Sequence, residues 1–153
     1  MNQVETIEIK KDDDLIKLEK VKALKYHLTL NDEETNQITL EDGEYFHFGD
    51  KEFLVLTDEE AEEQASDYIK NSVWAFNSSF LSSHTGIRED VFKLLSDKCE
   101  DSNDAVLSMI KDFDSFVRDA ISSDGRGHFI ATYDHGEYVE EINNTEYFIY
   151  RTN

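Results

Sequence analysis

The sequence predicts an α+β fold, in which a small antiparallel sheet with strands from both ends of the chain packs against a helical middle. Two observations predict it. β-Prone runs bounded by Gly, Asp and Asn lie before residue 57 and after residue 127, whereas the residues between carry apolar side chains at helical spacing. The 153 residues amount to about one domain. We therefore expect a single domain over residues 1–153, in which residues 1–43 could be a more loosely attached segment.

The N-terminal part is expected to hold a strand, a helix and a loop. Residues 4–9, VETIEI, alternate between polar and apolar side chains, which indicates a short strand or a loose arm. Residues 15–26 carry apolar side chains at roughly helical spacing, although part of this stretch also alternates like a strand, and we favour the helix. Residues 31–34 are predicted to be a polar loop.

Three strands are expected next. Residues 37–40 and 44–48 flank the turn pair Asp42-Gly43, and residues 45–48 should form a hairpin with residues 52–56. Residues 53–56, FLVL, are continuously apolar, which is typical of a strand covered on both faces.

The run EFLVLTDEEAEEQASDYIKNSVWAFNSSF, residues 52–80, is predicted to pass directly from this strand into a long amphipathic helix. Thr57 and Glu60 have the spacing of a capping box, which marks the helix start. The apolar stripe is expected to reach Phe80. Trp74 falls on the polar side of this helix, near Glu63 and Asp67. It either packs under a second layer of chain, which we favour, or serves as an interface anchor.

After a loop at residues 82–86, three further helices are expected. They cover residues 87–99, residues 105–110 with Ser102 or Asn103 as cap, and a last stretch capped by Asp114. A terminal hairpin should turn at Asn143-Asn144.

The one local group of chemically active side chains lies in DGRGH and the following YD. Asp124, Arg126, His128 and Asp134 are weak catalytic or ligand-binding candidates. Arg126 could bind a carboxylate or phosphate, and His128 could act as a base oriented by Asp124 or Asp134. The alternative, which we favour, is structural: a glycine turn ends a helix and starts a strand at His128, and Arg126 pairs with Asp134.

No established metal or cofactor motif accompanies these residues. HExxH, CxxC, EF-hand and Walker A patterns are absent, so we expect no metal and no cofactor, and a binding protein rather than an enzyme. Cys99 is the only cysteine, which predicts a reduced, intracellular setting without an internal disulfide. No signal-like or membrane-spanning apolar run is expected.

The formal net charge is −20, from 35 acidic and 15 basic residues. Such a field repels nucleic acid and anionic membranes, and it attracts basic proteins. Carboxylates four residues apart on a helix lie about 6 Å apart along its axis, while one DNA strand has a phosphate about every 3.4 Å. An acidic helix can therefore imitate DNA to a basic groove. The predicted partner-binding residues are Asp58, Glu59, Glu62, Glu63, Asp67 and Trp74.

Two motifs resemble a group of small acidic proteins encoded by bacteriophages and prophages. They are EFLVLTDEEAEE, followed by an acidic helix, and DGRGHFIATYD, followed by a hairpin that ends in YFIYR; together they bracket residues 44–151. The second motif departs from the pattern at His135, where glycine is expected. The residues that match it are Asp124, Gly125, Arg126, Gly127, His128, Tyr133 and Asp134.

The resemblance implies a phage protein in the cytoplasm of a bacterial host. We hypothesise an anti-CRISPR or anti-restriction inhibitor, a DNA mimic whose partner is a basic nucleic-acid-binding nuclease. One alternative is a small enzyme or ligand-binding domain that uses the DGRGH–YD region. The other is a phage housekeeping protein whose acidity only keeps it soluble.

Overall fold

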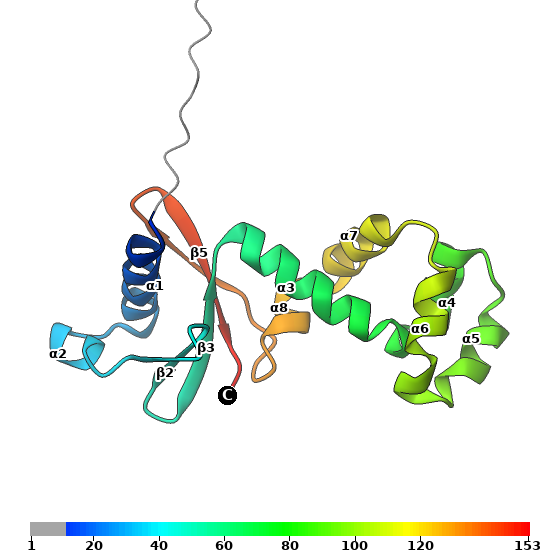
Figure 1. The fold of residues 1–153 in the computed structure, drawn as a ribbon, viewed down its shortest axis with the longest axis horizontal. Helices are drawn as coiled ribbons and strands as arrows, with labels where there is room; N and C mark the ends of the chain where they lie inside the picture. Colours follow the sequence, from blue (N-terminus) through cyan, green and yellow to red (C-terminus); the bar gives the residue numbers. More distant parts are fainter. Residues whose placement is uncertain (1–11) are drawn as a thin grey trace, which may run out of the picture.

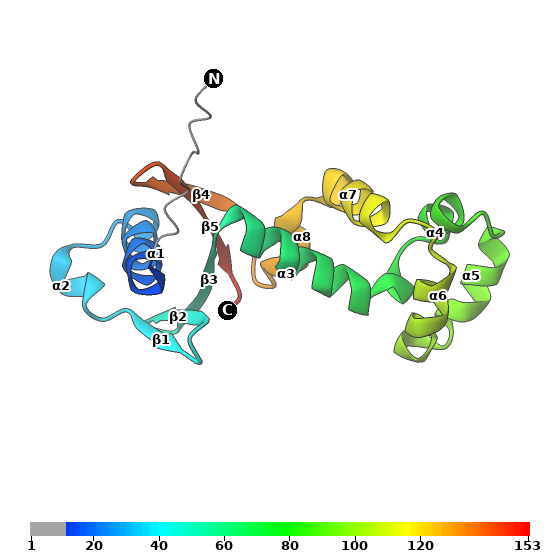
Figure 2. The ribbon, with the colours of Figure 1, turned by 45° about the horizontal axis from the view of Figure 1, so that its top comes forward.

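The computed structural model describes residues 12–153, so the strand or arm expected over residues 4–9 lies outside the described residues. Figure 1 shows an elongated molecule with a β-sheet at one end and a group of helices at the other. Helix α3 (Asp58–Asn71) runs between the two ends, and the turned view in Figure 2 shows the same arrangement. The expectation of a single domain stays a prediction.

The sheet contains strands from both ends of the chain, which confirms the predicted α+β fold. Its order is β1-β2-β3-β5-β4, and every neighbouring pair is antiparallel. The N-terminal and C-terminal strands meet where Leu54 pairs with Tyr150. The predicted turn at Asn143 and Asn144 is confirmed, and both residues have positive φ angles, 49° and 64°. The strands are β1 (Thr39–Glu41), β2 (Tyr45–Phe48), β3 (Lys51–Leu56), β4 (Tyr138–Ile142) and β5 (Thr145–Arg151).

Helices account for most of the rest of the described chain. Helix α1 precedes the sheet in sequence, and α4 to α7 form the group of helices at the far end (Figure 1). The helices besides α3 are α1 (Asp13–Leu28), α2 (Asp32–Thr35), α4 (Ser78–Thr85), α5 (Glu89–Ser96), α6 (Asn103–Met109), α7 (Phe113–Asp124) and α8 (Arg126–Ile130), with the 3-10 helices η1 (Val73–Ala75) and η2 (Cys99–Ser102).

Strand β3 is buried on both faces, as its continuous apolar run predicts. Leu54 and Leu56 pack in the core shared with α3, α7 and α8, and Phe53 and Val55 pack in the core under α1. Side chains alternate across a strand, so the four residues divide between the two faces. The sheet is therefore covered by α1 on one face and by α3 with α8 on the other.

A buried carboxylate helps to fix α1 against the sheet. Glu19 is only 3% exposed and accepts hydrogen bonds from the Tyr147 hydroxyl and, at 3.2 Å, from Asn143 Nδ2. Ala23 and Leu24 are fully buried beside it. A buried carboxylate is tolerated only when it is hydrogen-bonded, and these contacts meet that need.

Helix α3 begins as predicted and ends earlier than predicted. Thr57 Oγ1 accepts from the Glu60 amide at 3.3 Å, and Glu60 Oε2 accepts from the Thr57 amide at 3.0 Å, so the capping box is confirmed. The predicted continuation to Phe80 is wrong. The backbone leaves the helical region at Ser72 (φ −132°, ψ 17°), whose hydroxyl donates to the Tyr68 carbonyl. Helix α4 then starts after Asn77, which caps it by accepting from the Ser79 amide.

Three local predictions about helix ends are also corrected. Residues 31–34 were expected to be a loop, yet Asn31 and Glu34 form a capping box for α2. The loop expected at residues 82–86 is the last turn of α4, which Gly86 ends with a left-handed backbone (φ 72°). Helix α7 is capped by Asp112, which accepts from the Ser115 amide, and Asp114 lies within its first turn.

Candidate functional site

A groove lies between α1, the β1–β2 turn and α3. Its volume is about 580 Å³. The buried side chains of Phe46, Val55 and Leu56 contribute to its floor, because the end of the sheet lies beneath it. We call this hollow the acidic groove, for the side chains on its rim.

Carboxylates from three separate elements surround the acidic groove. Asp13 and Asp14 begin α1, Glu44 lies in the β1–β2 turn, and Glu63 and Asp67 lie on α3; all five are exposed. Among residues 12–153, the basic side chains that line it are those of Lys17 and Lys20.

Lys20 is already paired across the acidic groove. Its Nζ lies 2.6 Å from Glu60 Oε2, and its side chain is 15% exposed. Glu60 therefore caps α3 and also joins α3 to α1. The remaining rim carboxylates keep the groove strongly negative above an apolar floor.

The predicted acidic surface on α3 is divided between two sides of the helix. Glu63 and Asp67 face the acidic groove together with Glu60, at the three- and four-residue spacing of one helical stripe. Asp58 and Glu62 face Arg126 instead, with Asp58 Oδ1 2.7 Å and Glu62 Oε1 3.5 Å from its Nη1. Glu59, like the other four predicted acids, is exposed.

Trp74 does not lie beside the α3 acids as predicted, because α3 ends before it. It is half-buried in η1, and its backbone amide donates to Asn103 Oδ1 at 3.3 Å. The side-chain Nδ2 of Asn103 in turn donates to the Lys70 carbonyl. Trp74 therefore sits at the junction of η1 and α6, which separates it from the acidic groove.

Arg126 has a structural environment that differs from the predicted one. Its Nε donates to Glu137 Oε2 at 2.9 Å, its Nη1 donates to Asp58, and its guanidinium lies 4.4 Å from the centre of the Phe148 ring. The expected pair with Asp134 does not form. Burial opposes the charge of Arg126, but the hydrogen bonds to Glu137 and Asp58 outweigh it and raise the pKa of the guanidinium. Arg126 thus ties α8 to α3 and β5.

The structure does not bring the four weak catalytic candidates together. Asp124 and His128 line a hollow beside α3 and α4, whereas Arg126 is buried in its ion cluster. Asp134 lies near His27, at a different hollow, and accepts from the Gly136 amide at 2.9 Å.

His128 was predicted to start a strand, but it lies in the short helix α8. Its exposed ring is 5.4 Å from the His135 ring. The strand prediction fails because the chain leaves the glycine turn at Gly125 (φ 80°) as a helical turn that packs on α3.

Sequence reasoning missed much of the acidic groove. Asp13, Asp14 and Glu44 come from elements that no local pattern joins to α3. The spacing of Glu60, Glu63 and Asp67 is the one signal that could have identified a wall.

Within residues 12–153, no group of three or more His, Cys, Asp or Glu side chains is arranged to hold a metal ion. In the same part of the chain, no helix has both the length and the apolar character needed to cross a membrane. No protein family, curated protein or solved structure matches the chain.

Proposed function

We propose that this protein is a phage-encoded inhibitor of a bacterial defence nuclease, an anti-CRISPR or anti-restriction protein that acts in the host cytoplasm by binding the nuclease. The acidic groove is the observation that supports this most. A floor of apolar side chains under a rim of carboxylates suits a basic, partly apolar protein segment, such as those that line nucleic-acid channels.

The division of charge on α3 defines how such a partner would be recognised. Asp58 and Glu62 are partly neutralised by Arg126, whereas Glu63 and Asp67 line the acidic groove and are the α3 acids placed to replace phosphates there. Asp13, Asp14 and Glu44 extend the negative rim beyond one helix. The net charge of −20 would speed the approach of a cationic partner, and the rim would orient it.

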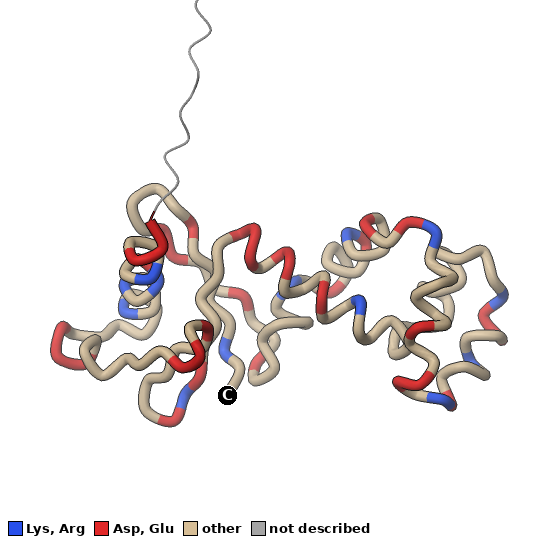
Figure 3. Tube along the Cα trace, in the orientation of Figure 1, with Lys and Arg blue, Asp and Glu red and all other residues tan. Residues whose placement is uncertain are grey.

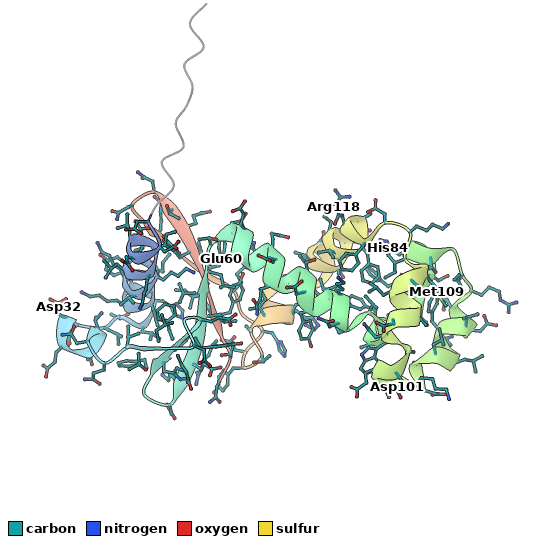
Figure 4. All side chains as sticks on the ribbon, in the orientation of Figure 1. Asp32, Glu60, His84, Asp101, Met109 and Arg118 are labelled. Atoms are coloured by element: carbon teal, nitrogen blue, oxygen red, sulfur yellow. The ribbon has the colours of Figure 1, made fainter. Side chains whose placement is uncertain are left out.

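The test compares two double charge reversals in nuclease inhibition assays. Glu63→Lys with Asp67→Lys alters the acidic groove, and Glu100→Lys with Asp101→Lys makes the same charge change at η2. Figure 4 shows Asp101 on the helical end of the molecule, far from Glu60. Purified CRISPR and restriction nucleases are assayed for DNA cleavage with each variant at low and high salt.

We expect the groove variant to inhibit at least about tenfold more weakly than wild type, because its rim repels the basic segment. The η2 variant should inhibit almost as well as wild type. Equal loss in both variants would support a role of charge in general attraction only. Absence of inhibition across the nuclease panel would reject the proposal and leave a housekeeping role.

A further inference from the structure

We infer that a second hollow, the aromatic pocket, binds the guanidinium group of an arginine side chain from the basic partner. Its volume is about 340 Å³, and the residues that define it here are Tyr68, Phe76, Phe80, Asp124, His128 and Phe129. The inference rests on the proposed function, because the partner supplies the arginine. It concerns a different surface from the acidic groove and a different kind of contact.

Aromatic rings from three parts of the chain line the pocket. The ring of Phe129 lies 6.1 Å from the ring of Tyr68 and 6.1 Å from that of Phe76, and Phe76 stacks on Phe80 at 5.5 Å. Tyr68 is 51% exposed, so a ligand can reach its ring. A planar guanidinium stacks well on such rings, whereas a lysine ammonium gains only a point-charge contact.

The pocket also carries negative charge, and none of the described residues that line it is Lys or Arg. The last turn of α7, including Ser123 and Asp124, forms one wall. The C-terminal end of a helix has a partial negative charge, and a carboxylate there is unfavourable for the helix itself. Asp124 is exposed and ends α7 despite this cost. Residues that break a local rule in this way are expected at functional sites.

The same chemistry already holds an arginine inside this protein. Arg126 lies over the Phe148 ring and donates to Glu137 and Asp58, so an aromatic face and carboxylates act on one guanidinium. Arg151 likewise lies 3.6 Å from the centre of the Tyr133 ring. The aromatic pocket offers the exposed ring of Tyr68 and the carboxylate of Asp124, and the described residues that line it include no arginine to fill it.

The aromatic pocket adjoins the acidic groove along α3. A middle hollow of about 270 Å³ shares Gln64 with the groove, and it shares Tyr68 and Phe129 with the pocket. From Glu60 to Ser72, the residue that follows α3, the backbone rises about 18 Å, at about 1.5 Å per residue. About six extended residues cover that distance, so one linear segment of the partner can reach both ends.

The test is an NMR titration of the isotope-labelled full-length protein with N-acetyl-arginine amide and, separately, with N-acetyl-citrulline amide. Citrulline has the shape of arginine without its charge. We expect the arginine compound to shift the amide signals of Tyr68, Ser72 and Asp124 in a saturable way. It should bind at least about tenfold more tightly than the citrulline compound.

Two variants and one control localise the binding. Asp124→Asn should weaken arginine binding about tenfold through loss of the charged hydrogen-bond acceptor, and Tyr68→Ala should weaken it about fivefold through loss of a stacking face. Asp101→Asn, an exposed change on η2, should have no effect. The melting temperature of Asp124→Asn should equal or exceed that of wild type, because the helix end is relieved of a carboxylate.

Equal binding of the citrulline compound, or full arginine binding by Asp124→Asn, overturns the inference. Failure of the proposed function gives a different result. If arginine binds as expected but no nuclease is inhibited, the pocket is an arginine site and only the nuclease proposal fails. If a nuclease is inhibited through the acidic groove while Asp124→Asn changes neither arginine binding nor inhibition, the pocket assignment fails alone.

Discussion

At the scale of single residues, Gly127 shows that the DGRGH motif serves the fold. A Cβ atom at this position would lie 2.5 Å from the His135 carbonyl oxygen and 2.8 Å from the Gly136 carbonyl carbon. Both atoms belong to the backbone, which cannot move aside cheaply. Gly127 therefore permits a close approach of the protein's own loop. The sequence alone also allowed the alternative that a ligand approaches the backbone here.

We predict that Gly127→Ala lowers the free energy of unfolding by about 2–3 kcal/mol, because the methyl group forces α8 away from the loop. Helix propensity alone would predict a gain of about 1 kcal/mol. The measurement is urea unfolding followed by circular dichroism. Gly43→Ala is the control, since its Cβ would meet no atom within 4 Å and only its positive φ opposes it. A smaller loss at Gly127 than at Gly43 would refute the proposed clash.

Two buried tyrosine hydroxyls should make the free energy of unfolding fall in alkali. Burial, and then the hydrogen bond to Glu19, raises the pKa of Tyr147; burial, and then the hydrogen bond to Glu137, raises the pKa of Tyr150. Below pH about 10, both tyrosines are protonated in the folded and the unfolded chain. Above it, only the unfolded chain ionises, so the free energy of unfolding should fall by about 1.4 kcal/mol per pH unit for each tyrosine.

Urea unfolding between pH 9 and 11 measures this slope. Tyr147→Phe should be less stable at neutral pH by about 1–2 kcal/mol, because Glu19 loses a hydrogen-bond donor. Its alkaline slope should nevertheless be shallower than that of wild type. Tyr26→Phe is the control, because Tyr26 is 49% exposed. If all three proteins share one slope, the tyrosines do not cause the alkaline loss.

At the scale of elements, features with their own local chemistry could be predicted better than features set by distant contacts. Thr57 with Glu60 and the pair Asn143-Asn144 carry their own hydrogen-bonding or turn chemistry, and both predictions are confirmed. The end of α3 depends on a tertiary contact, because Asn103 bonds to the backbone on both sides of the break; Ser72 adds a local bond to the Tyr68 carbonyl. Helical spacing continues through the break, so periodicity alone extended the helix too far.

Only part of the candidate site could be predicted for the same reason. Glu63 and Asp67 are recognisable as an acidic stripe within one element. Asp13, Asp14 and Glu44 join them only because α1 packs across the sheet and the β1–β2 turn reaches the same hollow. Arg126 had a partner assigned close in sequence, Asp134, but its actual partner on α3 is 68 residues away. Such long-range pairings are set by the tertiary fold.

We predict that the capping box of α3 contributes to stability and also to the shape of the acidic groove. Thr57→Ala should lower the free energy of unfolding by about 1 kcal/mol, since the Glu60 amide loses its acceptor. Asn31→Ala, which removes the equivalent cap of the four-residue helix α2, should cost less because that exposed turn has no buried residue. Urea unfolding of both variants checks the order. A larger loss for Asn31→Ala would contradict this account of α3.

At the scale of the whole molecule, acidic residues are found at both ends, and lysines on α1 lie among them (Figure 3). Net charge alone therefore does not distinguish the acidic groove from the remaining surface. The affinity of a specific partner must depend on the position of the carboxylates as well as on their number. Added salt can separate the effect of total charge from the effect of position. Screening of the general field is measured as a change in stability, and screening of the groove rim as a change in association with the partner.

Raising the salt concentration should affect stability and binding in opposite directions. With a net charge of −20, screening relieves self-repulsion, so the free energy of unfolding in urea should rise by about 1 kcal/mol between roughly 20 and 300 mM salt. Association with a basic nuclease should slow over the same range, because screening also weakens attraction. Glu63→Lys with Asp67→Lys and Glu100→Lys with Asp101→Lys each remove two negative charges and add two positive ones, so both should show the same reduced salt gain in stability. Only the groove pair should lose most of the salt-dependent association, measured by surface plasmon resonance. If both pairs lose it equally, the charge acts as a diffuse field and the acidic groove has no special role.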